Sequence, residues 1–310
     1  MRIVFFGTPD FAVPSLRALL GEGFDVAAVV TQPDRAHGRS RSTLVPPPVK
    51  DVAEAEGVPI FQPEQPNSPE FLEQLGALAP DLGVVVAYGH LLKPALLELP
   101  TRGMINVHAS LLPALRGAAP IQHAIMQDLE ETGVSIMQME AGMDTGPVLL
   151  RVPTPIARDE TGGELTVRLA ELGAFALIEA LALLQLDAVT PVPQDDEHAT
   201  LAPKITTEMA RIRWEEPAGR IARQVRALDP APGAWTELGD IRLKLFGPRR
   251  GGPVPDTARP GEVIDLEPAF TVATGEGALQ FVDVQPAGKS RIAVADWIRG
   301  RGATLGDRFA

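Results

Sequence analysis

The sequence predicts an α/β fold with a parallel sheet in its first half, followed by a small β-barrel or sandwich. In the first half, short apolar runs alternate with helical patterns, which is typical of βαβ units. Its continuous aliphatic runs suit strands that are covered on both faces. After about Ile205, short strand patterns lie between Gly- and Pro-rich turns, which favours an antiparallel β domain. A chain of 310 residues is long enough for two domains.

The predicted elements of the first half alternate along the chain. We expect strands at residues 2–6, 24–31, 82–86, 104–108, 133–139 and 148–152. We expect helices at 12–20, 49–56, 69–78, 120–127 and 164–186. One connection, 32–48, is rich in Pro, Arg and Ser, and loops of this length are often functional or disordered.

The second half begins after a stretch without periodicity. Residues 187–203 are rich in Pro, Asp and Gln, so we interpret them as a linker. Beyond it we expect strands at 241–246, 262–265, 270–273 and 279–284, with Trp214 and Trp235 as core anchors. The predicted organisation is a first domain at 1–188, a linker at 189–205 and a β domain at 206–310.

Composition and charge narrow the class of protein. The chain has no cysteine, which excludes disulfide scaffolds, cysteine nucleophiles and thiolate metal sites. No uncharged stretch approaches the ~18 residues of a membrane span, and the strand pattern from Arg2 leaves no room for a signal peptide. We therefore expect a cytoplasmic protein without a membrane segment. The net charge of −12 divides into −14 for residues 1–203 and +2 for 204–310. Unless that difference is scatter, a polyanion would bind the C-terminal third and local basic loops.

Asn106 and His108 lie two residues apart in the strand predicted at 104–108. Side chains alternate faces along a strand, so these two point the same way. In an open α/β sheet, ligands bind at the carboxyl ends of the strands. An amide there can stabilise a developing oxyanion, and an imidazole can transfer a proton near neutral pH. Two interpretations stay open: a reactive pair, or polar groups that satisfy the backbone at a strand end.

Two further polar segments can each be interpreted either as part of a ligand site or as local structure. Gly142 and Gly146 flank Asp144, which implies either a tight turn that holds a carboxylate beside a ligand or a plain hairpin turn. The segment Arg116–Pro120 precedes a predicted helix. Gly117 allows the backbone to approach a ligand closely, or the segment only starts the helix, since proline is common in a first helical turn. The histidines lack a ligand spacing such as His-x-x-x-His, so we expect no metal site.

Together these segments make the chain resemble the methionyl-tRNA formyltransferases along nearly its whole length. The matching segments are 6–11, 31–35, 85–89, 105–108, 110–113, 116–122, 144–146 and 285–289. The Asn-x-His, Ser-Leu-Leu-Pro and Asp-Thr-Gly set also occurs in other enzymes that use 10-formyltetrahydrofolate. The Thr-Gln-Pro-Asp-Arg loop, the Arg-Gly-Ala-Ala-Pro-Ile segment and the C-terminal domain favour methionyl-tRNA as the acceptor. The resemblance implies a Rossmann-like formyltransferase domain followed by an OB-like β-barrel that binds tRNA.

The resemblance also implies a reaction and its residues. A formyl group would pass from 10-formyltetrahydrofolate to the α-amino group of initiator methionyl-tRNA, without a metal or a covalent intermediate. Asn106 would donate to the formyl oxygen, His108 would accept the amine proton, and Asp144 would orient His108. The implied folate-binding residues are Tyr88, Gly89, Ser110, Leu111, Leu112, Pro113 and Gly142. The family suggests a monomer.

The implied tRNA contacts lie in and beside residues 32–48, an insertion that in the family reaches the acceptor end. They are Arg35, Arg39, Arg41 and Lys50. Arginine suits phosphate because its planar fork donates two hydrogen bonds at once. The chain departs from the family pattern after Arg39, where Ser-Arg-Ser replaces a glycine and two lysines, so one basic charge is lost. The alternative is that residues 32–48 form a solvated, disordered loop in the unliganded protein.

Three other functions would fit parts of the sequence. A formyltransferase with another acceptor, such as an amino sugar nucleotide or glycinamide ribonucleotide, would share the folate site. A nucleotide-dependent oxidoreductase is disfavoured, since Gly7-Thr-Pro-Asp lacks the G-x-G-x-x-G pattern and Pro9 removes an amide that a pyrophosphate needs. A non-catalytic tRNA-binding module is disfavoured by the presence of Asn106, His108 and Asp144.

Overall fold

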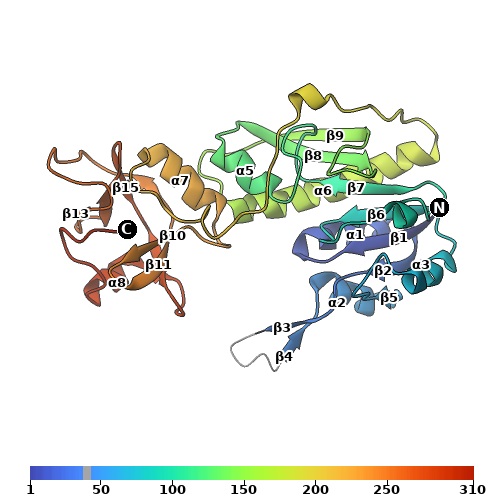
Figure 1. The fold of residues 1–310 in the computed structure, drawn as a ribbon, viewed down its shortest axis with the longest axis horizontal. Helices are drawn as coiled ribbons and strands as arrows, with labels where there is room; N and C mark the ends of the chain where they lie inside the picture. Colours follow the sequence, from blue (N-terminus) through green and yellow to red (C-terminus); the bar gives the residue numbers. More distant parts are fainter. Residues whose placement is uncertain (38–42) are drawn as a thin grey trace. The chain divides into compact units, whose positions relative to one another are not determined.

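The computed structural model describes residues 1–37 and 43–310, which form two compact units (Figure 1). Unit 1 comprises Met1–Pro120, Glu131–Pro155 and Thr166–Pro203. Unit 2 comprises Ile121–Glu130, Ile156–Leu165 and Lys204–Ala310. Two short segments of the first half of the chain therefore belong to the same unit as the C-terminal third. Each unit is described by itself below.

Unit 1 is built on a seven-stranded sheet with the order β5-β2-β1-β6-β7-β8-β9. These strands are β1 (Arg2–Gly7), β2 (Asp25–Val30), β5 (Ile60–Phe61), β6 (Leu82–Val86), β7 (Met104–His108), β8 (Glu131–Gln138) and β9 (Val148–Pro155). The first five in spatial order are parallel, while β8 and β9 are antiparallel to their neighbours. The predicted α/β class is confirmed, and β7 forms at the predicted residues.

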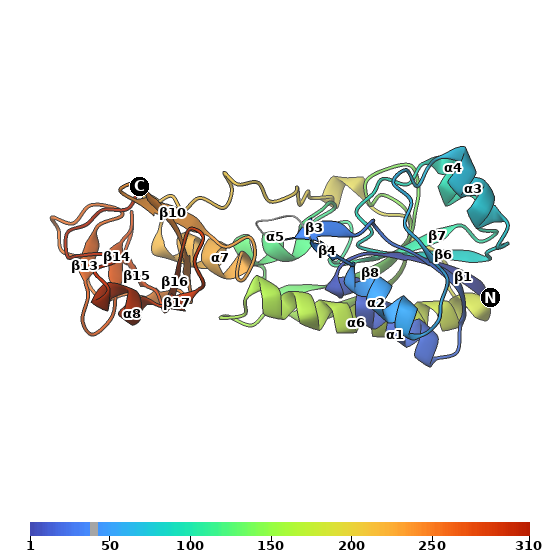
Figure 2. The ribbon, with the colours of Figure 1, turned by 90° about the horizontal axis from the view of Figure 1, so that it is seen from below.

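Helices cover both faces of this sheet. In unit 1 they are α1 (Val13–Gly21), α2 (Pro48–Ala55), α3 (Pro69–Gly76), α4 (Pro94–Leu97) and the part of α6 (Gly162–Gln185) from Thr166 onward. The 3-10 turns η1 (Asp10–Ala12) and η2 (Asp196–His198) belong to the same unit, whereas α5 (Pro120–Met126) lies in unit 2 except for Pro120. Figure 2 shows α1 and α6 on one face and α3 and α4 on the other. Proline occupies the first turn of α1, α2, α3 and α4, where its missing N–H has no helical partner to lose. Residues 3–6 of β1 are fully buried between these layers.

The connection predicted as a loop at 32–48 contains regular structure at its ends. Strand β3 (Arg35–His37) pairs antiparallel with β4 (Thr43–Val45). The run Thr43-Leu44-Val45 is rich in β-branched residues, which favour extended backbone. The loop prediction is therefore wrong for these six residues.

Unit 2 contains two four-stranded antiparallel sheets, β10-β11-β16-β17 and β12-β15-β14-β13. The strands are β10 (Trp235–Leu238), β11 (Ile241–Phe246), β12 (Arg249–Arg250), β13 (Val263–Asp265), β14 (Thr271–Ala273), β15 (Ala278–Gln280), β16 (Asp283–Pro286) and β17 (Ile292–Ala293). Helices α7 (Ala218–Ala227) and α8 (Val294–Arg299) complete the unit. Trp214 and Trp235 are 2% and 8% exposed in its core, as predicted.

The single strand predicted at 279–284 is wrong. Strands β15 and β16 share this stretch, and they belong to different sheets. Between them, the N–H of Phe281 donates to Phe270 and that of Val282 donates to Phe246. The chain passes from one sheet to the other here, and a single strand-like pattern does not reveal such a corner.

No helix in the described part of the chain combines the length and the hydropathy needed to cross a bilayer.

Candidate active site

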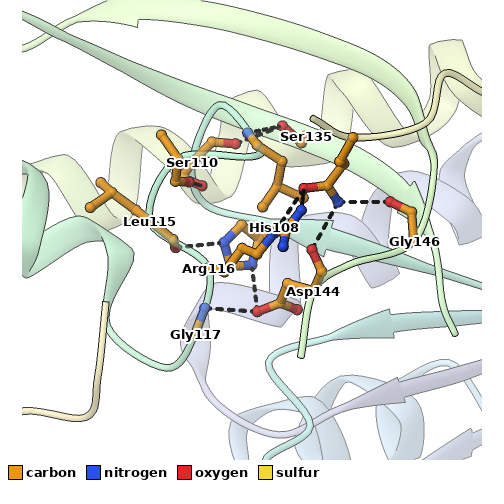
Figure 3. Close-up of polar contacts among 11 residues, drawn as sticks. His108, Ser110, Leu115, Arg116, Gly117, Ser135, Asp144 and Gly146 are labelled. Carbon is orange, nitrogen blue, oxygen red and sulfur yellow. Dashed lines mark hydrogen bonds and ion pairs between the residues drawn. The ribbon is translucent and has the colours of Figure 1, made fainter. Parts of the chain in front are cut away.

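His108 ends strand β7 and is 5% exposed. Its Nε2 lies 3.1 Å from the carbonyl oxygen of Leu115 (Figure 3). A carbonyl oxygen can only accept, so Nε2 carries a hydrogen and donates it. The other ring nitrogen, Nδ1, lies 3.7 Å from Oδ2 of Asp144. In the neutral ring Nδ1 therefore carries no hydrogen and is the nitrogen that can accept a proton.

Asp144 comes from the connection between β8 and β9 and approaches His108 from a different segment of the chain (Figure 3). Its side chain is 19% exposed, and Oδ2 accepts a hydrogen bond of 2.8 Å from the N–H of Gly117. Gly117 has φ +121°, and a Cβ there would lie 2.7 Å from the carbonyl oxygen of Ala202. Glycine is therefore required at 117 to bring this N–H to the carboxylate.

Asn106 lies two residues before His108 on β7, between Val85 of β6 and Met137 of β8. Strand geometry places its side chain on the same face as His108. The side chain is half-buried, and no group among the described residues forms a hydrogen bond with its amide. This amide is available to a bound molecule.

The predicted folate-binding segment 110–113 is fixed by contacts within the protein. Ser110 and Leu112 are each 1% exposed. The Ser110 hydroxyl donates to the carbonyl of Ala114 at 2.6 Å. The Ser135 hydroxyl donates to the Ser110 carbonyl at 2.7 Å and accepts from the Leu112 N–H at 3.0 Å. The polar groups of this segment are thus occupied, and the side chains of Leu111 and Pro113 are its more accessible parts.

Large apolar side chains are exposed beside two of the other predicted folate-binding residues. Leu91 is 79% exposed and lies two residues after Gly89. Met143 is 59% exposed and directly follows Gly142. Large apolar side chains exposed to solvent are typical of surfaces that contact a ligand.

Tyr88 has its ring in the interior. It is 1% exposed, and its ring packs edge-on against Phe6 with centroids 5.5 Å apart. Its backbone carbonyl accepts hydrogen bonds from Thr8 at 3.0 Å and Gln32 at 2.9 Å. Its hydroxyl has no hydrogen-bond partner within the described residues. Burial raises the pKa of the Tyr88 phenol from 10.0 to about 12.

Tyr88 is the only tyrosine of the chain, so its ionisation can be followed directly by the ultraviolet absorbance of phenolate. We expect this absorbance to rise near pH 12 in the folded protein and near pH ~10 in denaturant. The folded pKa is raised, so the folded state binds the proton more tightly. Its contribution to stability is complete below the unfolded pKa and is lost as pH rises from 10 to about 12. Phenolate formation near pH ~10, while circular dichroism still shows folded protein, would contradict the buried ring.

The predicted tRNA-binding residues divide into three cases. Lys50 lies 2.7 Å from Asp34, and this contact raises the pKa of its ammonium group. Hydrogen bonds from Gln62 and Lys50 hold the pKa of the Asp34 carboxyl below its ordinary value, so the pair is charged but mutually neutralised. Arg35 is exposed and donates to the side chain of Gln32. Arg39 and Arg41 lie outside the described residues.

Three residues that the sequence analysis did not single out contact this constellation. Ser135 holds the 110–113 segment, and Thr200 accepts from the N–H of Leu115 at 2.8 Å. Gln194 donates to the carbonyl of Asp144 at 2.8 Å. A serine inside the apolar run of β8 was the one available signal. Thr200 and Gln194 lie in the stretch interpreted as a linker, where local patterns carry no information about contacts.

No group of three or more His, Cys, Asp or Glu side chains within residues 1–37 and 43–310 is arranged to hold a metal ion.

Comparison with protein families matches residues 1–181 to the formyl transferase family and residues 204–302 to the formyl transferase C-terminal domain. The chain is 48% identical to the methionyl-tRNA formyltransferase of Halorhodospira halophila, over 99% of this chain and 98% of that protein. It is 47% identical to that of Geobacillus thermodenitrificans, over 98% and 95%.

Among solved structures, HypX from Aquifex aeolicus in complex with tetrahydrofolic acid is similar in fold, with a TM-score of 0.69 and 18% identity. That match covers 97% of this chain and 47% of HypX, so the chain spans about half the length of that protein. A methionyl-tRNA formyltransferase from Clostridium thermocellum matches with a TM-score of 0.57 and 15% identity, over 81% of this chain and 94% of that one. The chain belongs to the formyl transferase family and, within it, to the methionyl-tRNA formyltransferases.

Proposed function

We propose that Asn106, His108 and Asp144 catalyse in this chain the reaction of its family, the formylation of methionyl-tRNA. The formyl donor is 10-formyltetrahydrofolate, and the product is N-formylmethionyl-tRNA for translation initiation. The observation that carries the proposal is the approach of His108 Nδ1 to Asp144 Oδ2, 3.7 Å apart, on the face of the sheet that also bears the unpartnered Asn106 amide.

The reaction needs a base for the attacking amine. The neutral α-amino group attacks the formyl carbon, and the new C–N bond forms as the formyl oxygen gains negative charge. His108 Nδ1 accepts the proton that the amine loses, because Nε2 is occupied by Leu115. When the bond from the formyl carbon to N10 of the folate breaks, the same proton is delivered to N10. Protons and bonds balance, and tetrahydrofolate leaves.

Asn106 and Asp144 stabilise the two charges that appear during this step. The Asn106 amide donates to the formyl oxygen as it becomes an alkoxide, and a preorganised donor of this kind is worth ~2.7–4 kcal/mol of the barrier. Asp144 stabilises the imidazolium form of His108. Its carboxylate is itself held by the Gly117 N–H, so it does not have to reorganise when His108 becomes charged.

Residues 1–188 form the folate-binding catalytic domain in this proposal. The residues that hold the folate are Tyr88, Gly89, Ser110, Leu111, Leu112, Pro113 and Gly142. The exposed side chains of Leu91 and Met143 support the assignment, since an aromatic pterin would cover apolar surface that is otherwise in water. Ser110 and Leu112 contribute by shaping the segment, because their polar groups are satisfied internally.

Residues 206–310 and the 32–48 connection bind the tRNA in this proposal, with 189–205 as the linker. Arg35, Arg39, Arg41 and Lys50 contact the acceptor stem of the initiator tRNA. The exposed Arg35 supports this role more strongly than Lys50, whose charge is neutralised by Asp34. The protein acts as a monomer in the cytoplasm.

A panel assay tests the function. The purified protein is incubated with 10-formyltetrahydrofolate and separately with initiator methionyl-tRNA, elongator methionyl-tRNA and tRNAs charged with other amino acids. We expect N-formylmethionine on the initiator tRNA, formed in step with tetrahydrofolate. Release of tetrahydrofolate with formylation of an amino sugar nucleotide, and with none of the tRNAs, would assign the chain to another acceptor.

A further inference from the structure

The side-chain amide of Gln194 forms four hydrogen bonds, two to the turn that carries Asp144 and two to Arg116. Its Nε2 donates to the backbone carbonyls of Asp144 at 2.8 Å and Gly146 at 2.7 Å. Its Oε1 accepts from Nε of Arg116 at 3.0 Å and from Nη2 at 2.9 Å. A guanidinium only donates and a carbonyl only accepts, so this network allows one orientation of the amide.

The turn that Gln194 holds has an unusual backbone. Asp144 has φ +54°, in the left-handed region that L-residues rarely adopt. Gly146 follows closely, and a Cβ there would lie 2.0 Å from the carbonyl oxygen of Gln138. One amide group thus links the carbonyls on either side of Thr145. The direction of the Asp144 carboxylate toward His108 and Gly117 depends on this turn.

Arg116 fixes Gln194 from the interior. It is 6% exposed, and a buried guanidinium requires acceptors. Besides Gln194, its Nη2 donates to Asp196 at 2.8 Å. Its backbone N–H donates to the carbonyl of Thr200 at 2.8 Å, and its carbonyl accepts from Ala202 at 2.7 Å. The segment that carries Gln194 therefore continues alongside Arg116.

The same segment also supports His108. The Thr200 hydroxyl accepts from the N–H of Leu115, whose carbonyl in turn accepts from His108 Nε2. Leu115 has φ +59°, so it too has a strained backbone that its neighbours hold. All of these residues belong to unit 1.

We propose that Gln194 is a positioning residue for the catalytic Asp144. This inference rests on the proposed function and adds a residue to it. Gln194 acts through Asp144 by its two N–H donors, and Arg116 holds the amide in the orientation that presents them.

The test is a double-mutant cycle measured as single-turnover formylation of methionyl-tRNA. Gln194→Leu keeps a similar volume and removes all four hydrogen bonds. We expect it to lower the formylation rate constant about 10-fold, with changes of less than about twofold in KM for the folate and the tRNA. In an Asp144→Asn background, where the carboxylate is already lost, the same substitution is expected to change the rate less than about twofold.

Two further variants separate the donors of Gln194 from its acceptor. Gln194→Glu can still accept from Arg116 but has no N–H for the two carbonyls, so we expect it to be as slow as Gln194→Leu. Asp195→Asn is the matched control next in the chain. Its side chain is 59% exposed and contacts Glu197 and His198, so we expect the wild-type rate. Thermal unfolding of each variant establishes the folded fraction, and Gln194→Glu replaces the leucine variant in the cycle if the latter does not fold.

A wild-type rate in folded Gln194→Leu would overturn the inference, and so would an equal loss in both backgrounds, which would indicate a general effect on the fold. If the unaltered protein formylates no methionyl-tRNA, the proposed function fails instead.

Discussion

Replacing His108 by alanine is expected to lower the rate constant for formyl transfer at least ~100-fold, because general acid–base catalysis by a positioned side chain contributes about that much or more. Without the imidazole, the amine proton has no acceptor at the position of Nδ1, 3.7 Å from Asp144. Folate affinity should change little, since the ring is 5% exposed and its Nε2 is bound to Leu115. Single-turnover rates with saturating 10-formyltetrahydrofolate and methionyl-tRNA, together with folate binding by fluorescence, measure the two effects separately.

Two controls sharpen this result. His198→Ala removes an imidazole that is 79% exposed and pairs with Asp195, and it should retain the wild-type rate. If Asp144 acts through His108, the variant with both His108→Ala and Asp144→Asn should be no slower than His108→Ala alone. Near wild-type turnover in folded His108→Ala would remove this residue from the mechanism.

Replacing Asn106 by alanine is expected to lower the rate constant by about 10²–10³, the usual loss when one oxyanion donor is removed. The structure supports an effect on the transition state, because no described residue uses this amide and its loss breaks no internal hydrogen bond. The KM values for folate and tRNA should stay near those of the unaltered protein. The measurement is the same single-turnover assay, with the substrate concentrations varied in turn.

A second substitution at this position tests the charge argument. Asn106→Asp lacks the N–H donor and places a negative charge beside the developing alkoxide, so it should be at least as slow as Asn106→Ala. An aspartate variant that is faster than the alanine variant would show that Asn106 does not face the oxyanion. A loss confined to KM would instead make Asn106 a binding residue.

The arginine side chains of unit 2 bear on how this unit would bind tRNA. Several arginines of unit 2 are engaged in ion pairs, among them Arg220 with Glu216 and Arg223 with Asp128. Arg291 contacts both Asp229 and Asp283. Arg220 and Arg223 both lie on α7, and both side chains are held by acidic residues of the protein itself. Their charges are partly neutralised, and exposed arginines without such partners are better suited to phosphate.

Local patterns predicted those elements whose burial is uniform along their length. Strand β6 formed at the predicted residues, Leu82–Val86, because it is buried along its whole length. The strand predicted at 279–284 was wrong, because this stretch supplies strands to two different sheets. A change of sheet depends on hydrogen bonds to Phe246 and Phe270, which lie elsewhere in the chain.

The sequence by itself determined the fold class, the family and the pairing of Asn106 with His108 on one face of a strand, because these follow from short-range alternation and recognisable segments. Only the tertiary structure decided that Nδ1 of His108 faces Asp144, since Nε2 is occupied by the carbonyl of Leu115. It also brought Gln194 and Thr200 to the site from 50 and 85 residues away. Contacts at that separation depend on the path of the whole backbone, and no local preference of the residues themselves encodes that path.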